Sequence, residues 1–188
     1  MAGKKKILWC ATSLMLIFLF LWRIYYVNRH SRLPEINRIS QGESVLYRGL
    51  EYTVVHAELW EYADFFEQNQ EWQDYEGEGD EYAGAKLLLV EYRLEKGAEE
   101  NTLDLYIPIQ LGNWFNGMDP FMTAAMNPSM EEGTFRSGDT VVIPYVVYTV
   151  LLTDSQRQEV EDMSAQYLAV LGTYPVRNEL VISDVERK

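Results

Sequence analysis

The residues with the most obvious capacity for chemistry are the closely spaced acids of DYEGEGDEYAG, residues 74–84. Acids alternate from Asp74 onward and Gly79 takes the sixth position, as in the first half of a calcium-binding loop. The pattern then fails, because glutamates occupy positions three and five and Ala85 takes the twelfth, where such loops place a bidentate glutamate. We therefore expect a solvated loop and no metal site.

An aromatic pair in GNWFNGMDPFMTAAMNP, residues 112–128, is the second candidate. Trp114 and Phe115 stand beside asparagines and Asp119, and such a mixture of flat apolar rings and polar groups suits a sugar. Trp114, Phe115 and Asp119 are therefore the predicted ligand-binding residues. The alternative is a loop whose aromatic side chains pack back onto the core.

Catalytic chemistry has little support in the sequence. His56 lies in a strand-like segment with no cysteine, serine motif or second histidine nearby, so we expect an ordinary strand residue there. The nucleophile elbow, zinc-protease, P-loop and dinucleotide signatures do not occur in the sequence. A carboxylate pair of the glycosidase type remains as an enzymatic alternative. The sequence thus predicts no enzyme, no catalytic residue and no cofactor.

Charge is unevenly distributed along the chain. Residues 1–32 hold six of the 16 basic residues and no acid, so the remainder carries 10 basic and 29 acidic residues, a balance of −19. A surface this acidic repels phosphate backbones, and no nucleic-acid partner is expected. Cys10 is the only cysteine, which leaves residues 11–188 without a disulfide or a thiolate metal site.

The N-terminal pattern predicts a membrane anchor. Only Arg23 is charged between Ile7 and Val27, and a helix over this stretch would be about 31 Å long, close to the hydrocarbon thickness of a bilayer. A cleaved signal peptide would have a shorter apolar core and a small-residue cleavage site. We therefore expect a basic tail, a single transmembrane anchor, a polar stalk and an extracytoplasmic head, although the flanking charges nearly tie. Their predicted ranges are 1–6, 7–27, 28–43 and 44–188.

Short apolar segments separated by turn signals fill the head and predict strands. The predicted strands lie within 45–60, 86–96, 103–111, 135–152, 167–172 and 178–183. Short helices are expected over 60–72 and 155–164, where Thr153 or Ser155 can begin a capping box. The expected fold class is all-β, an immunoglobulin-like two-sheet sandwich with one or two short helices, preceded by the transmembrane helix.

The order of these segments resembles a known group of domains. AKLLLVEYRLEKG precedes LDLYIPIQLGNWFNGMDPFMTAAMNP, and the turn Gly138-Asp139-Thr140-Val141 opens the next strand. This layout, over residues 44–184, is similar to the immunoglobulin-like domains of unknown function on bacterial membrane-anchored proteins and lipoproteins, notably in Gram-positive anaerobes. The resemblance implies an extracytoplasmic β-sandwich and supplies no catalytic residues.

These observations favour a membrane-anchored binding or structural module of the cell envelope. Its expected partners are the membrane, through a single span, and another envelope protein, a peptide or a glycan. An accessory subunit of a transporter, secretion or sensing complex is the alternative, and an envelope hydrolase that uses a carboxylate pair is the third hypothesis.

Overall fold

The computed structural model describes residues 2–31, 33–96, 106–131 and 136–188, and these form two compact units, Met1–Pro34 and Glu35–Lys188. Helix α1, Ala2–His30, makes up most of the first unit. In the part of the chain that is described, no helix has the length and apolar character needed to cross a bilayer. This finding overturns the predicted transmembrane anchor over residues 7–27.

The second unit contains two five-stranded sheets. The first sheet has the order β1-β9-β8-β5-β6, with the bounds Glu35–Ile39, Val176–Ile182, Tyr167–Leu171, Ile109–Leu111 and Trp114–Asn116. The second has the order β10-β3-β4-β7, with the bounds Glu186–Arg187, Leu50–Glu61, Lys86–Lys96 and Thr140–Val147. Strand β2, Ser44–Tyr47, also pairs with β3. Strand β1 thus lies within the range predicted as a polar stalk.

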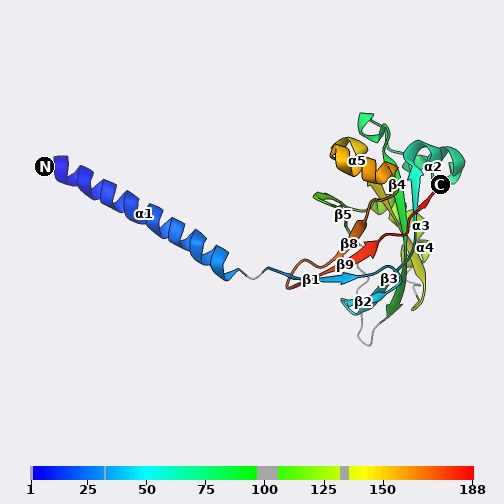
Figure 1. Ribbon diagram of the computed structural model, residues 1–188, viewed down its shortest axis with the longest axis horizontal. Helices are drawn as coiled ribbons and strands as arrows, with labels where there is room; N and C mark the ends of the chain where they lie inside the picture. Colours follow the sequence, from blue (N-terminus) through cyan, green and yellow to red (C-terminus); the bar gives the residue numbers. More distant parts are fainter. Residues whose placement is uncertain (1, 32, 97–105, 132–135) are drawn as a thin grey trace. The chain divides into compact units, whose positions relative to one another are not determined.

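The main apolar core lies between the two sheets, and helices cover the outer face of the second sheet (Figure 1). Tyr92 and Tyr145 are fully buried in the core, while Phe66 of α2 packs against Leu87 on the other face of β4. The short helices are α2 (Tyr62–Gln68), α3 (Pro120–Met126), α4 (Pro128–Glu131) and α5 (Asp154–Glu161), with 3-10 turns η1 (Gln70–Tyr75), η2 (Asp80–Tyr82) and η3 (Thr149–Leu151).

The predicted all-β immunoglobulin-like sandwich is therefore wrong. Among the described residues of the second unit, the α-helices α2 to α5 and three 3-10 turns accompany the strands, so the fold is mixed. In addition, β1 pairs with β9 and β10 pairs with β3 in parallel, whereas an immunoglobulin sandwich is built from antiparallel sheets. The Gly- and Asn-rich composition of residues 112–128 concealed α3, which begins with the helix-start signal Asp119-Pro120.

Helix α5 confirms the predicted capping box. Thr153 is the N-cap and its hydroxyl accepts from the Gln156 backbone N–H, while the Gln156 side chain accepts from the Thr153 backbone N–H at 2.9 Å. Two unsatisfied donors of the first turn are thereby bonded. Gln156 also donates to the Leu111 carbonyl at 2.7 Å, which ties α5 to the end of β5.

A β-bulge at Val55 changes which side chains of β3 face the core. Val54 pairs with Tyr92 and His56 pairs with Glu91, so one residue of β3 is unmatched between them. Val54 and Ala57 are both fully buried, and His56 is turned outward. Strict alternation from Val54 would have placed His56 in the core. The extra residue of the bulge shifts the alternation by one position, so that Ala57 faces the core instead.

The free edge of β7 is covered by side-chain and backbone groups of residues 116–127. The Asn127 amide accepts from the Val142 N–H at 2.9 Å and donates to the Val142 carbonyl at 2.7 Å. The Asp119 backbone N–H donates to the Pro144 carbonyl, and the Asn116 amide donates to the Val146 carbonyl. Edge strands left with open hydrogen-bonding groups promote aggregation, so this segment protects the second sheet.

The hydroxyl of Tyr167 gives a direct test of core energetics. It is buried and has no hydrogen-bond partner among the described residues. We expect Tyr167→Phe to raise the free energy of unfolding by about 1 kcal/mol, because the unpaired hydroxyl is removed. Tyr145→Phe is the matched control and should lower it, since the Tyr145 hydroxyl donates to the Ile107 carbonyl at 2.8 Å. Urea denaturation of both variants measures the difference, and a loss of stability in Tyr167→Phe would contradict this assignment.

Candidate functional site

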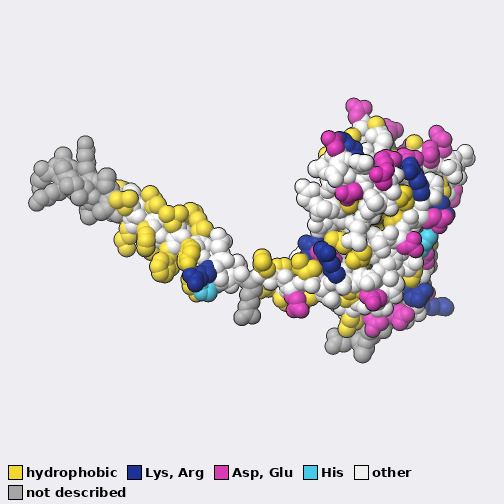
Figure 2. All heavy atoms as spheres, viewed as in Figure 1, with side chains coloured by type: hydrophobic (Ala, Val, Ile, Leu, Met, Phe, Trp, Pro, Cys, Tyr) yellow, Lys and Arg dark blue, Asp and Glu magenta, His cyan; other side chains and the backbone are white. Residues whose placement is uncertain are grey.

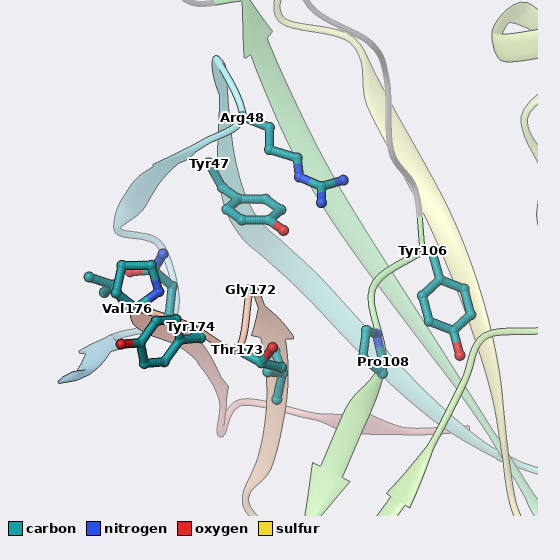
Figure 3. Close-up of a pocket in the computed structure, with 11 residues that line it drawn as sticks. Tyr47, Arg48, Tyr106, Pro108, Gly172, Thr173, Tyr174 and Val176 are labelled. Carbon is teal, nitrogen blue, oxygen red and sulfur yellow. The ribbon is translucent and has the colours of Figure 1, made fainter. Parts of the chain in front are cut away.

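An open groove of about 550 Å³ lies where the β2–β3 turn, the β8–β9 turn and the segment before β5 meet (Figure 3). We call it the tyrosine groove. Its lining consists of Tyr47, Arg48, Tyr106, Pro108, Val170, Gly172, Thr173, Tyr174, Pro175, Val176 and Asn178.

The β2–β3 turn forms the first wall of the groove. Tyr47 pairs with Leu50, so Arg48 and Gly49 alone make the turn, with φ angles of 48° and 78°. Positive φ at both central positions is the type I′ geometry, which matches the twist of a hairpin and suits glycine. An arginine in this region carries backbone strain, and such strain is concentrated at ligand-binding and catalytic sites.

Gly172 provides the floor beneath the Tyr47 ring. The Arg48 guanidinium lies 5.3 Å from the centre of this ring, within reach of a cation–π interaction. A Cβ atom on Gly172 would stand 3.0 Å from Cε2 of Tyr47, and the φ of Gly172 is 72°. Only glycine meets both requirements without strain. The backbone at Gly172 therefore lies close against the Tyr47 ring, on which the Arg48 guanidinium rests.

Two further tyrosines flank this centre. Figure 3 shows Tyr174 on one side of Tyr47 and Tyr106 on the other. Their side chains are well exposed, at 69% for Tyr174 and 64% for Tyr106. Aromatic side chains offer large flat contact areas at a low cost in conformational entropy. The groove thus presents aromatic rings from three separate chain segments.

The electrostatic character of the groove differs from that of the chain as a whole. The described lining residues include Arg48 and no acidic side chain, although the chain has 29 acids against 16 bases. Figure 2 shows acidic side chains spread over the visible face of this unit. An anionic group in the groove therefore meets an arginine and no carboxylate from the described lining.

Comparison with known proteins places this unit in a family. Residues 36–178 match the domain of unknown function DUF5028. The chain belongs to this family. Every lining residue of the tyrosine groove falls within the matched range, so the groove is a feature of the DUF5028 domain of this chain.

No curated protein matches the chain. Among solved structures, a protein from Staphylococcus aureus subsp. aureus NCTC 8325, described as "a putative lipoprotein", is similar to it. The identity is 10% and the TM-score is 0.40, over 80% of this chain and 97% of that chain.

The DUF5028 domain separates the residues predicted to bind a ligand. Trp114 lies in the core, whereas Phe115, the next residue of β6, is 51% exposed, so the two rings face opposite sides of the strand. Asp119 is the N-cap of α3, where its carboxylate accepts from the Met122 N–H at 2.9 Å. The structure thus gives Trp114 and Asp119 structural contacts and leaves Phe115 at the surface. Ligand binding by these residues stays a prediction.

The acidic segment 74–84 is attached to the domain by tyrosines. The Gly77 N–H donates to the Tyr62 hydroxyl at 2.7 Å, and the Tyr82 ring lies 4.9 Å from the Tyr62 ring and 5.4 Å from that of Tyr148. None of the acids in this segment belongs to a three-residue group with metal-ligand spacing among the described residues. The acids of the segment are all exposed, as expected of a solvated loop, while Gly77 and Tyr82 attach it to the domain.

Sequence reasoning missed the tyrosine groove. One signal was present, because Arg48-Gly49 between two strand patterns is typical of a two-residue hairpin turn. Tyr106 and Tyr174 lie far apart in the chain and line the same groove only because β5 pairs with β8. No local pattern predicts this arrangement.

Proposed function

We propose that this chain is a non-catalytic binding module of the cell envelope and that its tyrosine groove binds a glycan carrying carboxylate groups. The observation that carries the proposal is the Arg48 side chain, held in a strained turn over Tyr47, in a lining whose described residues contain no acid.

A glycan fits this groove better than a compact apolar ligand. Sugar rings stack their C–H faces on exposed aromatic rings such as those of Tyr106 and Tyr174 and bring hydroxyl groups that bond to polar neighbours such as Thr173. The planar fork of Arg48 matches the geometry of a carboxylate. An open groove between loops also allows a chain-like ligand to extend past both ends.

The lining supports binding without catalysis. Its described residues include no histidine or carboxylate, the side chains that most often act as general acid or base, and no cysteine for a thiol nucleophile.

The location in the envelope is part of the proposal. It is supported by the sequence, in which residues 11–188 contain no cysteine and can fold unchanged in an oxidising compartment. Protease treatment of intact cells tests it, because an extracytoplasmic domain is cleaved without lysis and a cytoplasmic one is protected.

Calorimetric titration with hexagalacturonate tests ligand binding. We expect saturable binding to the full chain and a loss of at least tenfold in affinity for Tyr174→Ala. Phe121→Ala, which removes an aromatic ring from α3 that is at least as exposed, should cause no change. Neutral chito-oligosaccharide should bind more weakly, since it lacks the carboxylates. Tighter binding of a hexaglutamate peptide, or equal affinity of the wild type and Tyr174→Ala, would contradict the proposal.

The strain at Arg48 leads to a second prediction. Arg48→Gly should raise the free energy of unfolding by about 0.5–1 kcal/mol, because glycine adopts positive φ without penalty. The same variant should lose most of its affinity for hexagalacturonate. Met163→Gly is the matched control, since Met163 also has positive φ, at 56°, and lies outside the groove lining. It should keep its affinity, although the loss of a side chain that packs against the core lowers its stability; a stabilised Arg48→Gly that still binds normally would show that the arginine has no binding role.

The accessory-subunit alternative is favoured by one observation. Apolar side chains of α1 such as Leu14, Phe18 and Leu21 are 58–67% exposed within their unit, and Figure 2 shows apolar groups along this helix. A partner subunit would cover them. Co-purification separates the two functions, because Phe18→Glu abolishes capture of a partner in an assembly and leaves hexagalacturonate binding unchanged.

A further inference from the structure

A cluster of ligand-type side chains lies on the outer face of the second sheet. Nε2 of His56 is 3.2 Å from Oε1 of Glu58 and 3.7 Å from Oε2 of Glu186. One ligand atom from each of the three residues lies within 4.8 Å of the other two. From this geometry we propose that His56, Glu58 and Glu186 bind a divalent transition-metal ion such as Zn²⁺.

The backbone brings these three side chains together. His56 and Glu58 are two residues apart on β3, and the parallel partner of Glu58 on β10 is Glu186. The bulge at Val55 turns His56 away from the core, so that it joins the carboxylates at the surface. Bulges frequently redirect a side chain beside a functional site.

The two separations from the imidazole nitrogen are close to the edges of a coordination polyhedron. With metal–ligand distances of about 2.1 Å, neighbouring ligand atoms stand about 3.0 Å apart in an octahedral site and about 3.4 Å apart in a tetrahedral one. The observed 3.2 and 3.7 Å therefore require only a small contraction around an ion.

The other oxygen of each carboxylate is already held by a neighbour. Trp60 Nε1 donates to Oε2 of Glu58 at 3.1 Å, and the Lys188 ammonium donates to Oε1 of Glu186 at 2.7 Å. Such outer contacts orient the ligand oxygens of a metal site. They leave Oε1 of Glu58 and Oε2 of Glu186 directed at His56.

The cluster already attracts a cation. Besides its bond to Glu186, the Lys188 ammonium lies 3.4 Å from Oε1 of Glu58, one of the proposed ligand atoms. The pKa of Glu58 is lowered: burial raises it, but hydrogen bonds from Trp60 and His56 and the charge of Lys188 outweigh this. Glu58 is therefore ionised at neutral pH, and a metal ion has to compete with Lys188.

The imidazole selects the class of ion. A neutral histidine nitrogen with two carboxylate oxygens suits Zn²⁺, Ni²⁺ or Cu²⁺, whereas Ca²⁺ takes oxygen ligands only. The charged groups around His56 are Glu58, Glu186, Lys188 and, opposite it on β4, Glu91.

Calorimetry with Zn²⁺ on the metal-free full chain tests the site. We expect one saturable site, at least a tenfold loss of affinity for His56→Asn and for Glu186→Gln, and no change for His30→Asn, the other histidine of the chain. Lys188→Ala should bind Zn²⁺ more tightly, because the competing ammonium is gone; a purely structural role of the cluster predicts no such gain.

Tryptophan fluorescence provides an independent readout. Because Trp60 contacts Glu58, Cu²⁺ in this site should quench its emission, and Trp60→Phe should remove the quenching. Absence of saturable Zn²⁺ binding, unchanged binding in His56→Asn, or Ca²⁺ binding as tight as Zn²⁺ binding would overturn the proposal. Circular dichroism verifies the fold of each variant, and the partial exposure of His56 makes its replacement mild for stability.

Discussion

Replacing Asn127 with alanine is expected to lower the free energy of unfolding by about 3 kcal/mol. Asn127 is buried, and its amide makes three hydrogen bonds: one to the Thr123 carbonyl and two to the backbone of Val142. The variant leaves the Val142 N–H and carbonyl without these partners beside the core. An unmade bond to a buried group costs about 1–3 kcal/mol, and two such groups are affected.

Asn69→Ala is the matched control. The Asn69 side chain donates a hydrogen bond of similar length, 2.8 Å, to the Phe65 carbonyl at the end of α2, where water can replace it. Asn69→Ala should lower the free energy of unfolding by at most about 1 kcal/mol. Guanidinium denaturation followed by circular dichroism measures both variants. Equal costs for the two asparagines would mean that Asn127 does not protect the edge of β7.

The second large effect concerns the buried ammonium of Lys86. This side chain is only 7% exposed, and its Nζ lies 2.5 Å from Oε1 of Glu61 and 2.9 Å from Oε1 of Glu161. Arg187 contacts the same two carboxylates at 3.3 and 3.6 Å. The network joins β3, β4, α5 and β10.

We expect the double variant Glu61→Gln/Glu161→Gln to lower the free energy of unfolding by about 2–3 kcal/mol, because it leaves the Lys86 charge desolvated and without a carboxylate. The cost stays below that of a fully buried pair, since Glu61 and Glu161 are 35% and 52% exposed. Adding Lys86→Met to this double variant should restore most of the stability, because no buried charge remains. A triple variant less stable than the double variant would contradict this account.

The network also predicts a dependence on pH. The hydrogen bond from Lys86 holds the pKa of Glu161 below its usual value, so this carboxylate contributes stability above about pH 4.5 and loses it as pH falls through the lowered pKa. Burial lowers the pKa of Lys86, but its bonds to Glu61 and Glu161 raise it more, so its contribution persists below about pH 10.5 and is lost above. The stability difference between the wild type and the double variant should therefore be largest between these limits and shrink in acid.

The local features of the fold followed from the sequence because they depend on neighbouring residues. The run Lys86–Lys96 is a strand with the predicted bounds, and the capping box at Thr153 begins α5 as expected. Both signals lie within a few residues of the structure that they specify. The same is true of the cap at Asp119, whose Asp-Pro signal was present and was overlooked.

The wrong fold class has a different physical origin. Whether β1 and β10 pair in parallel with β9 and β3 depends on contacts between segments more than a hundred residues apart. The bulge at Val55 likewise changes the direction of His56 with no glycine or proline to mark it. The tyrosine groove and the metal cluster both depend on such long-range pairings, which is why neither was predicted from periodicity.

The most direct test of the central claim is a nuclear magnetic resonance titration of the full chain, carrying ¹³C-labelled tyrosine rings, with hexagalacturonate. The account predicts that ring signals of Tyr47, Tyr106 and Tyr174 shift and saturate together, while those of the buried Tyr92 and Tyr167 stay unchanged. Saturable binding that leaves the three groove tyrosines unshifted, or no binding at all, would contradict it.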